Sequence, residues 1–265
     1  MYLATYIFGD DDSTELFKKI QPMSKLGNIN VMERIVLEQN KLSENTNVDI
    51  TSLRAHIGRS PLLGEIACAL GHLKIYKAFS DLNLDWALVF EEDANIIDID
   101  CLVKHAQAVL SFNITAPSII SLYSEYPYIN RYCKNKFRKS EFVKIPFAPW
   151  NTVAYFINKS AANLFINSQE PLKYLADWPY VSSKEICFFV VETHLIMHGN
   201  SDRVSTIDST RGLRIVNTSN RFAIWTGLWY FKNRKTFTNI KEYFYILLLP
   251  RIRFHYDQIM TKINL

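Results

Sequence analysis

A run of five apolar residues that ends in three consecutive acids constrains the fold of this chain more than any other feature. Residues 86–90 read WALVF, and Glu91, Glu92 and Asp93 follow directly. Such a run is typical of a strand buried on both faces of a parallel or mixed sheet. Because ligands of open α/β sheets bind at the carboxyl ends of strands, the acids are expected to face a crevice. A divalent ion such as Mn²⁺ or Mg²⁺ would relieve their mutual repulsion, and a solvated acidic loop is the alternative.

The segments on either side alternate between strand and helix patterns. A helix is predicted after Ser60 and Pro61, a favourable cap and a favourable first residue. Its apolar positions recur at helical spacing and predict a core-facing stripe of Ile66, Ala69, Leu70, Leu73 and Tyr76. The other predicted elements are strands at residues 1–8, 118–123 and 153–157, helices at residues 13–20 and 160–167, and an amphipathic segment at residues 31–42. This alternation indicates an α/β layered sheet.

Composition limits the class of protein. A length of 265 residues with 48% hydrophobic content allows one large domain, or one domain with an appendage, and excludes wholesale disorder. The four cysteines match neither a zinc-ligand spacing nor a dense disulfide framework, so reduced thiols in a cytosolic protein are expected. The N-terminus lacks the basic region of a secretory signal, and no stretch approaches the about 18 apolar residues of a membrane span.

The C-terminal segment, residues 221–265, differs from the rest by an excess of Lys and Arg interleaved with large aromatic residues. This mixture suits an anionic membrane surface. It equally suits a helical subdomain that packs its aromatic residues inward, and the two interpretations are compatible. Single-stranded nucleic acid is bound by similar surfaces, but no nucleic-acid motif accompanies this one, so no such partner is expected. The predicted domains are therefore residues 1–220 and residues 221–265.

Several blocks together resemble one known family. Residues 63–73 read LGEIACALGHL, residues 88–94 LVFEEDA, residues 151–161 NTVAYFINKSA and residues 176–178 ADW. In order and spacing they resemble glycosyltransferase family 25, which includes bacterial lipooligosaccharide galactosyltransferases. Its members typically read G-E-x-G/A-C-x-x-S-H-x-x-x-W, then an apolar strand closing with E-D-D, then G-T-x-A-Y-x-I-S-R-K-x-A and P-V-D-W.

The chain departs from that family pattern at several positions. Gly71 and Tyr76 replace the family's usual Ser and Trp, and these changes are expected to alter packing. Glu92 replaces an Asp and moves the carboxylate by one methylene, which bears on metal preference. Three acids at residues 10–12 stand where the family has an Arg-rich segment. They are expected to form a turn and a helix N-terminus rather than a second metal cluster.

The resemblance implies a GT-A-like fold, a Rossmann-like mixed sheet flanked by helices, here with a basic, aromatic C-terminal helical extension. The implied reaction is inverting transfer of a hexose, galactose by analogy, from a UDP-sugar to a lipooligosaccharide or other saccharide acceptor. The implied location is cytoplasmic, peripheral on the inner face of the bacterial inner membrane. A metal-dependent phosphohydrolase and a non-catalytic binding protein of the same fold are the alternatives.

The same resemblance assigns the groups that meet the donor. Glu92 and Asp93 are the expected ligands of Mn²⁺ or Mg²⁺, which neutralises the departing diphosphate. Glu91, Thr152 and Trp178 are the expected contacts of the nucleotide sugar, and the Trp178 ring suits stacking on a sugar face.

The proton acceptor and the remaining polar residues complete the expected site. Asp177 matches the P-V-D position and is the expected general base, with a cap or turn before Pro179 as the alternative. Glu65 is expected to cap its helix rather than contact substrate. His72 is expected to be a hydrogen-bonded core histidine rather than a ligand. His194 and His198, four residues apart, are expected to share a helix face and to offer a third metal ligand.

Overall fold

The structure is a computed structural model, and part of the chain is described in it. Described are residues 3–8, 16, 18–21, 29–35, 47–57, 59–123, 138–139, 142–145, 148–149, 151–176, 185–191 and 195–198. Of residues 29–35, 138–139 and 198 only the backbone is described. The predicted C-terminal segment, residues 221–265, lies outside these ranges, and so do Asp177 and Trp178.

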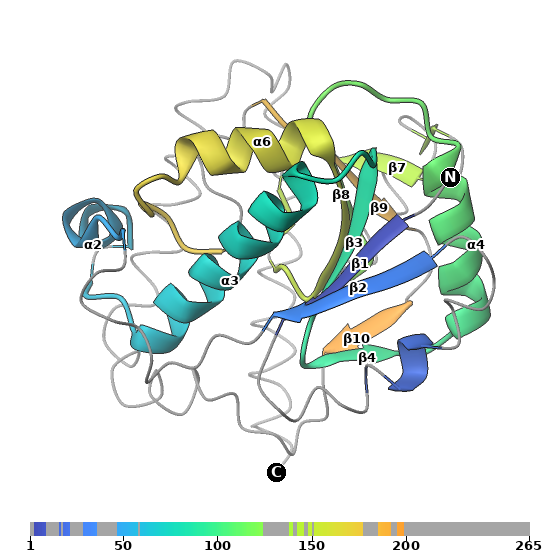
Figure 1. Ribbon diagram of the computed structural model, residues 1–265, viewed down its shortest axis with the longest axis horizontal. Helices are drawn as coiled ribbons and strands as arrows, with labels where there is room; N and C mark the ends of the chain where they lie inside the picture. Colours follow the sequence, from blue (N-terminus) through green and yellow to red (C-terminus); the bar gives the residue numbers. More distant parts are fainter. Residues whose placement is uncertain are drawn as a thin grey trace, which may run out of the picture.

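An eight-stranded mixed sheet forms the centre of the molecule, with strand order β2-β1-β3-β8-β5-β9-β7-β6 (Figure 1). Its strands are β1 (Leu3–Phe8), β2 (Ile29–Ile35), β3 (Trp86–Glu91), β5 (Ser118–Ser121), β6 (Arg138–Lys139), β7 (Phe142–Ile145), β8 (Ala154–Asn158) and β9 (Cys187–Val191). β1 pairs in parallel with β2 and β3, whereas β8 runs antiparallel to both β3 and β5. The expected α/β class with a mixed sheet flanked by helices is confirmed; the GT-A-like assignment stays a prediction.

Strand direction brings distant residues to one edge of the sheet. β1 and β3 end together, because Phe8 lies opposite Glu91 in the parallel register. β8 runs the other way, so the residues that precede it lie at the same edge: the Glu91 amide donates to the Val153 carbonyl at 2.8 Å. A second, two-stranded sheet, β4 (Ala94–Ile96) with β10 (Ile196–His198), follows β3 directly.

Helices cover both faces of the central sheet (Figure 1). α3 (Leu63–Ser80) and α6 (Lys159–Ser168) pack on one face, where the predicted stripe of α3 contributes Tyr76 to a buried cluster with Ala87, Val89 and Tyr155. α4 (Ile99–Leu110) packs on the other face, where Leu102, Ala106 and Val109 meet the opposite side chains of β3. α2 (Ile50–Ile57) lies beside the first half of α3.

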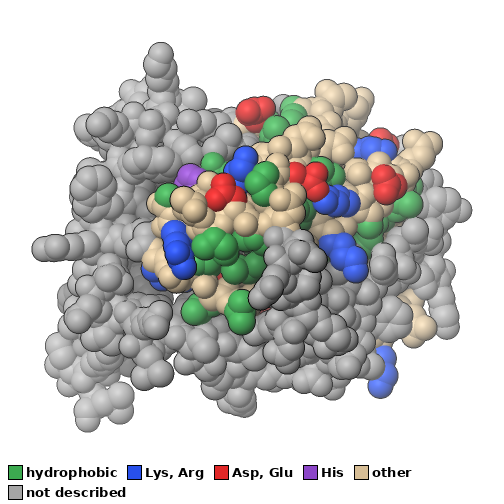
Figure 2. Space-filling view, turned by 60° about the vertical axis from the view of Figure 1, so that its left-hand side comes forward, with side chains coloured by type: hydrophobic (Ala, Val, Ile, Leu, Met, Phe, Trp, Pro, Cys, Tyr) green, Lys and Arg blue, Asp and Glu red, His purple; other side chains and the backbone are tan. Residues whose placement is uncertain are grey.

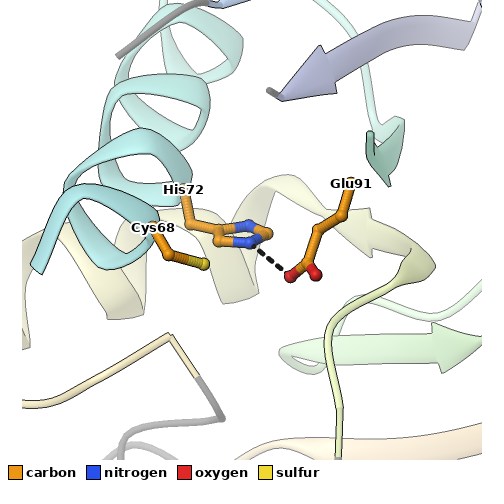
Figure 3. Close-up of side chains that lie close together, drawn as sticks. All are labelled: Cys68, His72 and Glu91. Atoms are coloured by element: carbon orange, nitrogen blue, oxygen red, sulfur yellow. Dashed lines mark hydrogen bonds and ion pairs between the residues drawn. The ribbon is translucent and has the colours of Figure 1, made fainter. Parts of the chain in front are cut away.

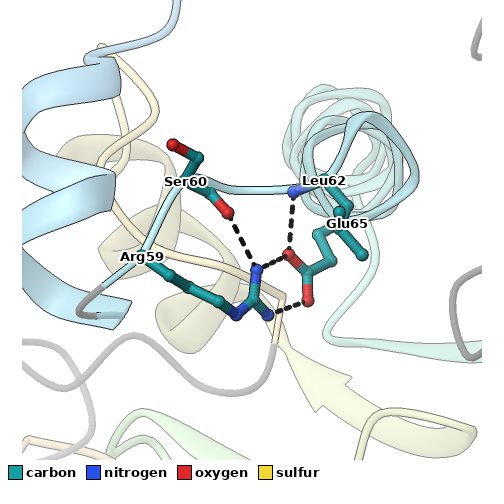
Figure 4. Close-up of polar contacts among 4 residues, drawn as sticks. All are labelled: Arg59, Ser60, Leu62 and Glu65. Carbon is teal, nitrogen blue, oxygen red and sulfur yellow. Dashed lines mark hydrogen bonds and ion pairs between the residues drawn. The ribbon is translucent and has the colours of Figure 1, made fainter. Parts of the chain in front are cut away.

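The start of α3 differs from the prediction. The N-cap residue is Leu62, not Ser60, and Leu62 makes no side-chain cap. Instead the Glu65 carboxylate accepts the Leu62 amide at 3.0 Å and the Arg59 guanidinium at 2.8 and 2.5 Å (Figure 4). Glu65 is only 3% exposed, so the ion pair with Arg59 compensates its burial. Glu65 therefore acts as a helix cap, as expected.

In two other segments the secondary structure differs from the prediction. The first residues of the amphipathic segment expected at 31–42 are a strand: they belong to β2, Ile29–Ile35, which pairs with β1. Tertiary pairing at a sheet edge overrides local pattern there. His198 lies in β10, paired with Ala94 of β4, so residues 196–198 form a strand and not the helix face expected for the two histidines. His194 lies outside the described residues.

The surface of the described part carries both signs of charge. Figure 2 shows acidic and basic side chains interspersed on one face, where no block of a single sign gathers among the described residues. Within the described residues, no helix is long and apolar enough to cross a membrane.

Candidate active site at the edge of the sheet

Polar groups from three segments converge where β1 and β3 end. β3 supplies Glu91 at its last position, and the turn from β3 to β4 supplies Glu92 and Asp93. The segment that enters β8 supplies Asn151 and Thr152. These groups lie together because β8 is antiparallel to β3, so the carboxyl end of one strand meets the start of the other.

Glu91 is held by two side chains. The Thr152 hydroxyl donates to Glu91 Oε1, and His72 Nε2 lies 3.0 Å from the same oxygen. His72 comes from α3 and is 2% exposed, whereas the Glu91 side chain keeps 19% of its surface exposed. Glu91 therefore stands between the core and solvent, with its carboxylate oriented from the protein side.

Behind His72 a chain of buried hydroxyls continues into the core. His72 Nδ1 lies 2.7 Å from the Tyr155 hydroxyl, which lies 2.8 Å from the Tyr76 hydroxyl. Burial raises the pKa of both phenols, so they stay protonated. A carboxylate cannot donate, so a neutral His72 donates from Nε2 to Glu91, accepts at Nδ1 from Tyr155, and Tyr155 accepts from Tyr76.

This network confirms the expectation that His72 is a buried, hydrogen-bonded histidine. Both of its ring nitrogens have a partner, one on the sheet edge and one in the core. The arrangement fixes the imidazole and through it the Glu91 carboxylate. Sequence reasoning did not foresee the roles of Tyr76 and Tyr155. Tyr76 lies on the core-facing stripe and Tyr155 within an apolar strand, and neither pattern shows what a hydroxyl will meet.

Glu92 and Asp93 are half-buried in the turn that leaves β3. Shortly before β8, the side-chain oxygen Oδ1 of Asn151 is buried and has no hydrogen-bond partner in the described part of the structure. Its neighbour Thr152 bonds Glu91, which places Asn151 at the same edge. Carboxylate and amide oxygens are the ligands that Mg²⁺ and Mn²⁺ prefer, so the residues present fit a hard divalent ion.

The segment that leads to Asp177 and Trp178 is well anchored, although these two residues are not themselves described. Gln169 Oε1 accepts the backbone amides of Lys173 and Tyr174, each at 3.0 Å. The Leu172 amide donates to the Asn47 carbonyl at 2.9 Å, and Leu172 packs against Leu53 and the first half of α3. Asp177 and Trp178 thus follow a fixed stretch of chain, and their roles stay predictions.

The fold and the site define an α/β protein whose polar groups gather at the carboxyl edge of a mixed sheet. The model of glycosyltransferase family 25 (LPS biosynthesis protein) matches residues 15–179, more than half of the chain. The chain belongs to glycosyltransferase family 25. The matched region contains α3, β3 and β8, which together build the site. Membership makes glycosyl transfer the general activity, and it implies a nucleotide-sugar donor and a saccharide acceptor.

Two solved structures are similar to the chain at low scores. A197 from STIV is 13% identical, with 78% of this chain and 98% of that chain covered and a TM-score of 0.38. A glycosyltransferase involved in the glycosylation of the major capsid of PBCV-1 is 10% identical, with 71% and 93% covered and a TM-score of 0.31. At these TM-scores neither likeness carries an argument. No curated protein shows significant sequence similarity to the chain.

Proposed function

We propose that this chain transfers a hexose, galactose, from a UDP-sugar to a lipooligosaccharide or other saccharide acceptor, with inversion at the anomeric carbon. The observation that carries the proposal is the Glu92–Asp93 turn at the edge where β1 and β3 end, in a chain of this family. A donor diphosphate brings negative charge to the same edge, and two carboxylates tolerate it only with a cation between them.

Glu92 and Asp93 would hold Mn²⁺ or Mg²⁺, with the buried Oδ1 of Asn151 as a further oxygen at this edge. When bound, the ion offsets the charge that develops on the departing diphosphate. The protein residues around it restrain the turn. Glu91 keeps its position through Thr152 and His72, so the two carboxylates that follow leave β3 from a fixed point. Glu91 and Thr152 lie beside the donor in this proposal.

Asp177 would take the proton of the acceptor hydroxyl as that oxygen attacks the anomeric carbon from the face opposite the leaving diphosphate. Trp178 would stack on a sugar ring. Support for this placement comes from the anchored segment before Ala176, which packs against α3. The basic, aromatic residues of 221–265 would hold the enzyme at the anionic inner face of the bacterial inner membrane, where lipid-linked acceptors are displayed.

The first experiment is a thermal-unfolding panel with UDP, UDP-galactose, UDP-glucose, UDP-N-acetylglucosamine and CMP-sialic acid, each with and without Mn²⁺. A ligand at one hundred times its dissociation constant stabilises the native state by about 2.7 kcal/mol. We expect a Mn²⁺-dependent rise in the midpoint with UDP-galactose and its loss in Asp93→Asn. Asp85→Asn is the matched control, because Asp85 is an exposed acid just before the opposite end of the same strand.

Other outcomes of these measurements would contradict the proposal in different ways. An equal shift without metal would show that Glu92 and Asp93 do not hold an ion for the donor. Release of inorganic phosphate without any effect of acceptor sugars would identify a phosphohydrolase. Binding without turnover of any donor would identify a non-catalytic protein. Where turnover occurs, the anomeric configuration of the product, read by NMR, tests inversion directly.

A further inference from the structure

A thiol lies beside the His72–Glu91 pair, and the proposed glycosyl transfer does not use it. Cys68 and His72 are four residues apart on α3 and so share one face of the helix. One ligand atom each from Cys68, His72 and Glu91 lie within 4.8 Å of one another. Figure 3 shows the sulfur pointing toward the imidazole and the carboxylate, which come from helix and strand respectively. Cys68 is half-buried.

We propose that Cys68, His72 and Glu91 form a site for a borderline divalent ion, Zn²⁺, that joins α3 to the end of β3. Thiolate, imidazole and carboxylate are the three side-chain groups that zinc uses in proteins. With ordinary bond lengths, a tetrahedral zinc sets its nitrogen and oxygen ligands about 3.3 Å apart and its sulfur about 3.6 Å from either. His72 Nε2 and Glu91 Oε1 are already 3.0 Å apart. The Cys68 sulfur lies within 4.8 Å of a ligand atom of each partner, so these distances shorten by up to about 1.2 Å when the set is complete.

The surroundings of the three ligands suit this role. A histidine that binds a metal through one ring nitrogen usually donates from the other to an oxygen. His72 Nδ1 has such a partner in Tyr155, and Tyr155 contacts Tyr76 in turn. Thr152 restrains Glu91 from the opposite side. His72 and Glu91 therefore both have outer partners that orient them.

The protons balance without another reactant. Without metal, a neutral His72 carries its proton on Nε2 and accepts from Tyr155. With metal on Nε2, that proton resides on Nδ1 and is donated to Tyr155, whose hydroxyl turns to donate to Tyr76. The Cys68 thiol loses its proton to solvent and binds as thiolate. The thiol proton is the one that leaves for each ion bound.

This site differs in chemistry from the oxygen-only set of Glu92 and Asp93. Hard ions such as Mg²⁺ and Mn²⁺ favour the oxygen set, whereas sulfur and nitrogen favour Zn²⁺ or Co²⁺. The cysteine spacing in the sequence did not indicate a zinc site, because this one takes a single cysteine and completes it from another element. Zinc binding is measured without donor or acceptor, so its failure and the failure of the proposed transferase activity are separate results.

The test is a titration of the reduced 265-residue protein with Co²⁺, and then with Zn²⁺, in the presence of saturating Mg²⁺ to occupy oxygen sites. We expect a thiolate-to-cobalt charge-transfer band that saturates at one equivalent and is displaced by Zn²⁺. Cys68→Ser removes that band and weakens Co²⁺ affinity by more than about tenfold, at least the effect of losing an outer partner. Tyr155→Phe keeps the band and weakens binding by about 10–100-fold.

Cys101→Ser is the matched control. Cys101 and His105 are also four residues apart, on α4, with Sγ and Nδ1 3.7 Å apart, but within the described residues no carboxylate joins them as a third ligand. A second measurement needs no variant: Zn²⁺ should protect Cys68 from alkylation in the wild-type protein, read by peptide mass spectrometry. The proposal is overturned if the band is absent, persists in Cys68→Ser, or vanishes in Cys101→Ser, or if Zn²⁺ leaves Cys68 alkylation unchanged.

Discussion

The Phe8 ring packs directly against the backbone of Gly71 and leaves no room there for a side chain. Gly71 is buried in the middle of α3, and a Cβ built on it falls no more than 2.7 Å from three carbons of the Phe8 ring. Real Cβ atoms do not approach other atoms below 3.0 Å, so any side chain at residue 71 displaces that ring. Phe8 also contacts His72, with ring centroids 5.6 Å apart. The family's usual Ser at residue 71 therefore does not fit while Phe8 stays in place.

Gly71→Ala sets two opposing effects against each other. An overpacked core side chain costs about 1–3 kcal/mol. Replacing a mid-helix Gly by Ala contributes about 1 kcal/mol in the other direction. The net expectation is a loss of about 1 kcal/mol in the free energy of unfolding, taking the middle of the first range. In a Phe8→Ala background the ring is gone, and the same substitution should stabilise by up to about 1 kcal/mol.

Urea unfolding of the four proteins, followed by circular dichroism, completes the double-mutant cycle. The coupling energy between the two sites should be about 2 kcal/mol, with the effect of Gly71→Ala changing sign between backgrounds. An equal destabilisation in both backgrounds would refute the reasoning, because it would show that the Phe8 ring is not what the new methyl group meets.

Three further predictions concern the buried network and the start of α3. Tyr155→Phe removes the hydroxyl between His72 and Tyr76 and should lower the free energy of unfolding by about 1–3 kcal/mol. Tyr76→Phe removes the hydroxyl at the end of that chain and should cost less. A lower urea midpoint for Tyr76→Phe than for Tyr155→Phe would contradict this order of hydrogen bonds. Burial raises the pKa of both phenols above about 10, the value of an exposed tyrosine. At a pH above about 10 the native state therefore keeps phenol protons that the unfolded state releases. Their contribution to stability is thus complete below pH of about 10 and falls as pH rises above it; a pH series of urea unfolding should show this fall, and a smaller one in Tyr76→Phe. Arg59→Lys removes the bidentate contact with the Glu65 carboxylate. Because Arg59 is 41% exposed, the free energy of unfolding should fall by only about 1 kcal/mol. An unchanged melting temperature would argue against that contact.

Much of the site could be anticipated because it follows a strongly patterned strand. The apolar run before Glu91 predicted a doubly buried strand, and β3 occupies it with its first five residues buried. The same pattern placed the three acids at the carboxyl end of a strand, where the structure has them. The residues that restrain Glu91 could not be anticipated, since His72 lies 19 residues away in sequence and Thr152 lies 61.

The local departures have the same origin. Residues 29–35 pair with β1 as strand because the sheet edge offers hydrogen bonds that a local pattern does not record. α3 begins after Leu62 and not after Ser60, where the Glu65 carboxylate, itself bound by Arg59, accepts the Leu62 amide.

By itself, the sequence determined the α/β class, the buried strand and the acids that follow it, because burial imprints apolar runs and helical periodicity on the chain. Only the tertiary structure decided which partners meet: Glu91 with Thr152 and His72, and Cys68 beside them. Hydrogen bonds and metal ligands depend on atoms placed within a few ångströms, and such distances between α3, β3 and β8 arise only when helix and sheet pack together.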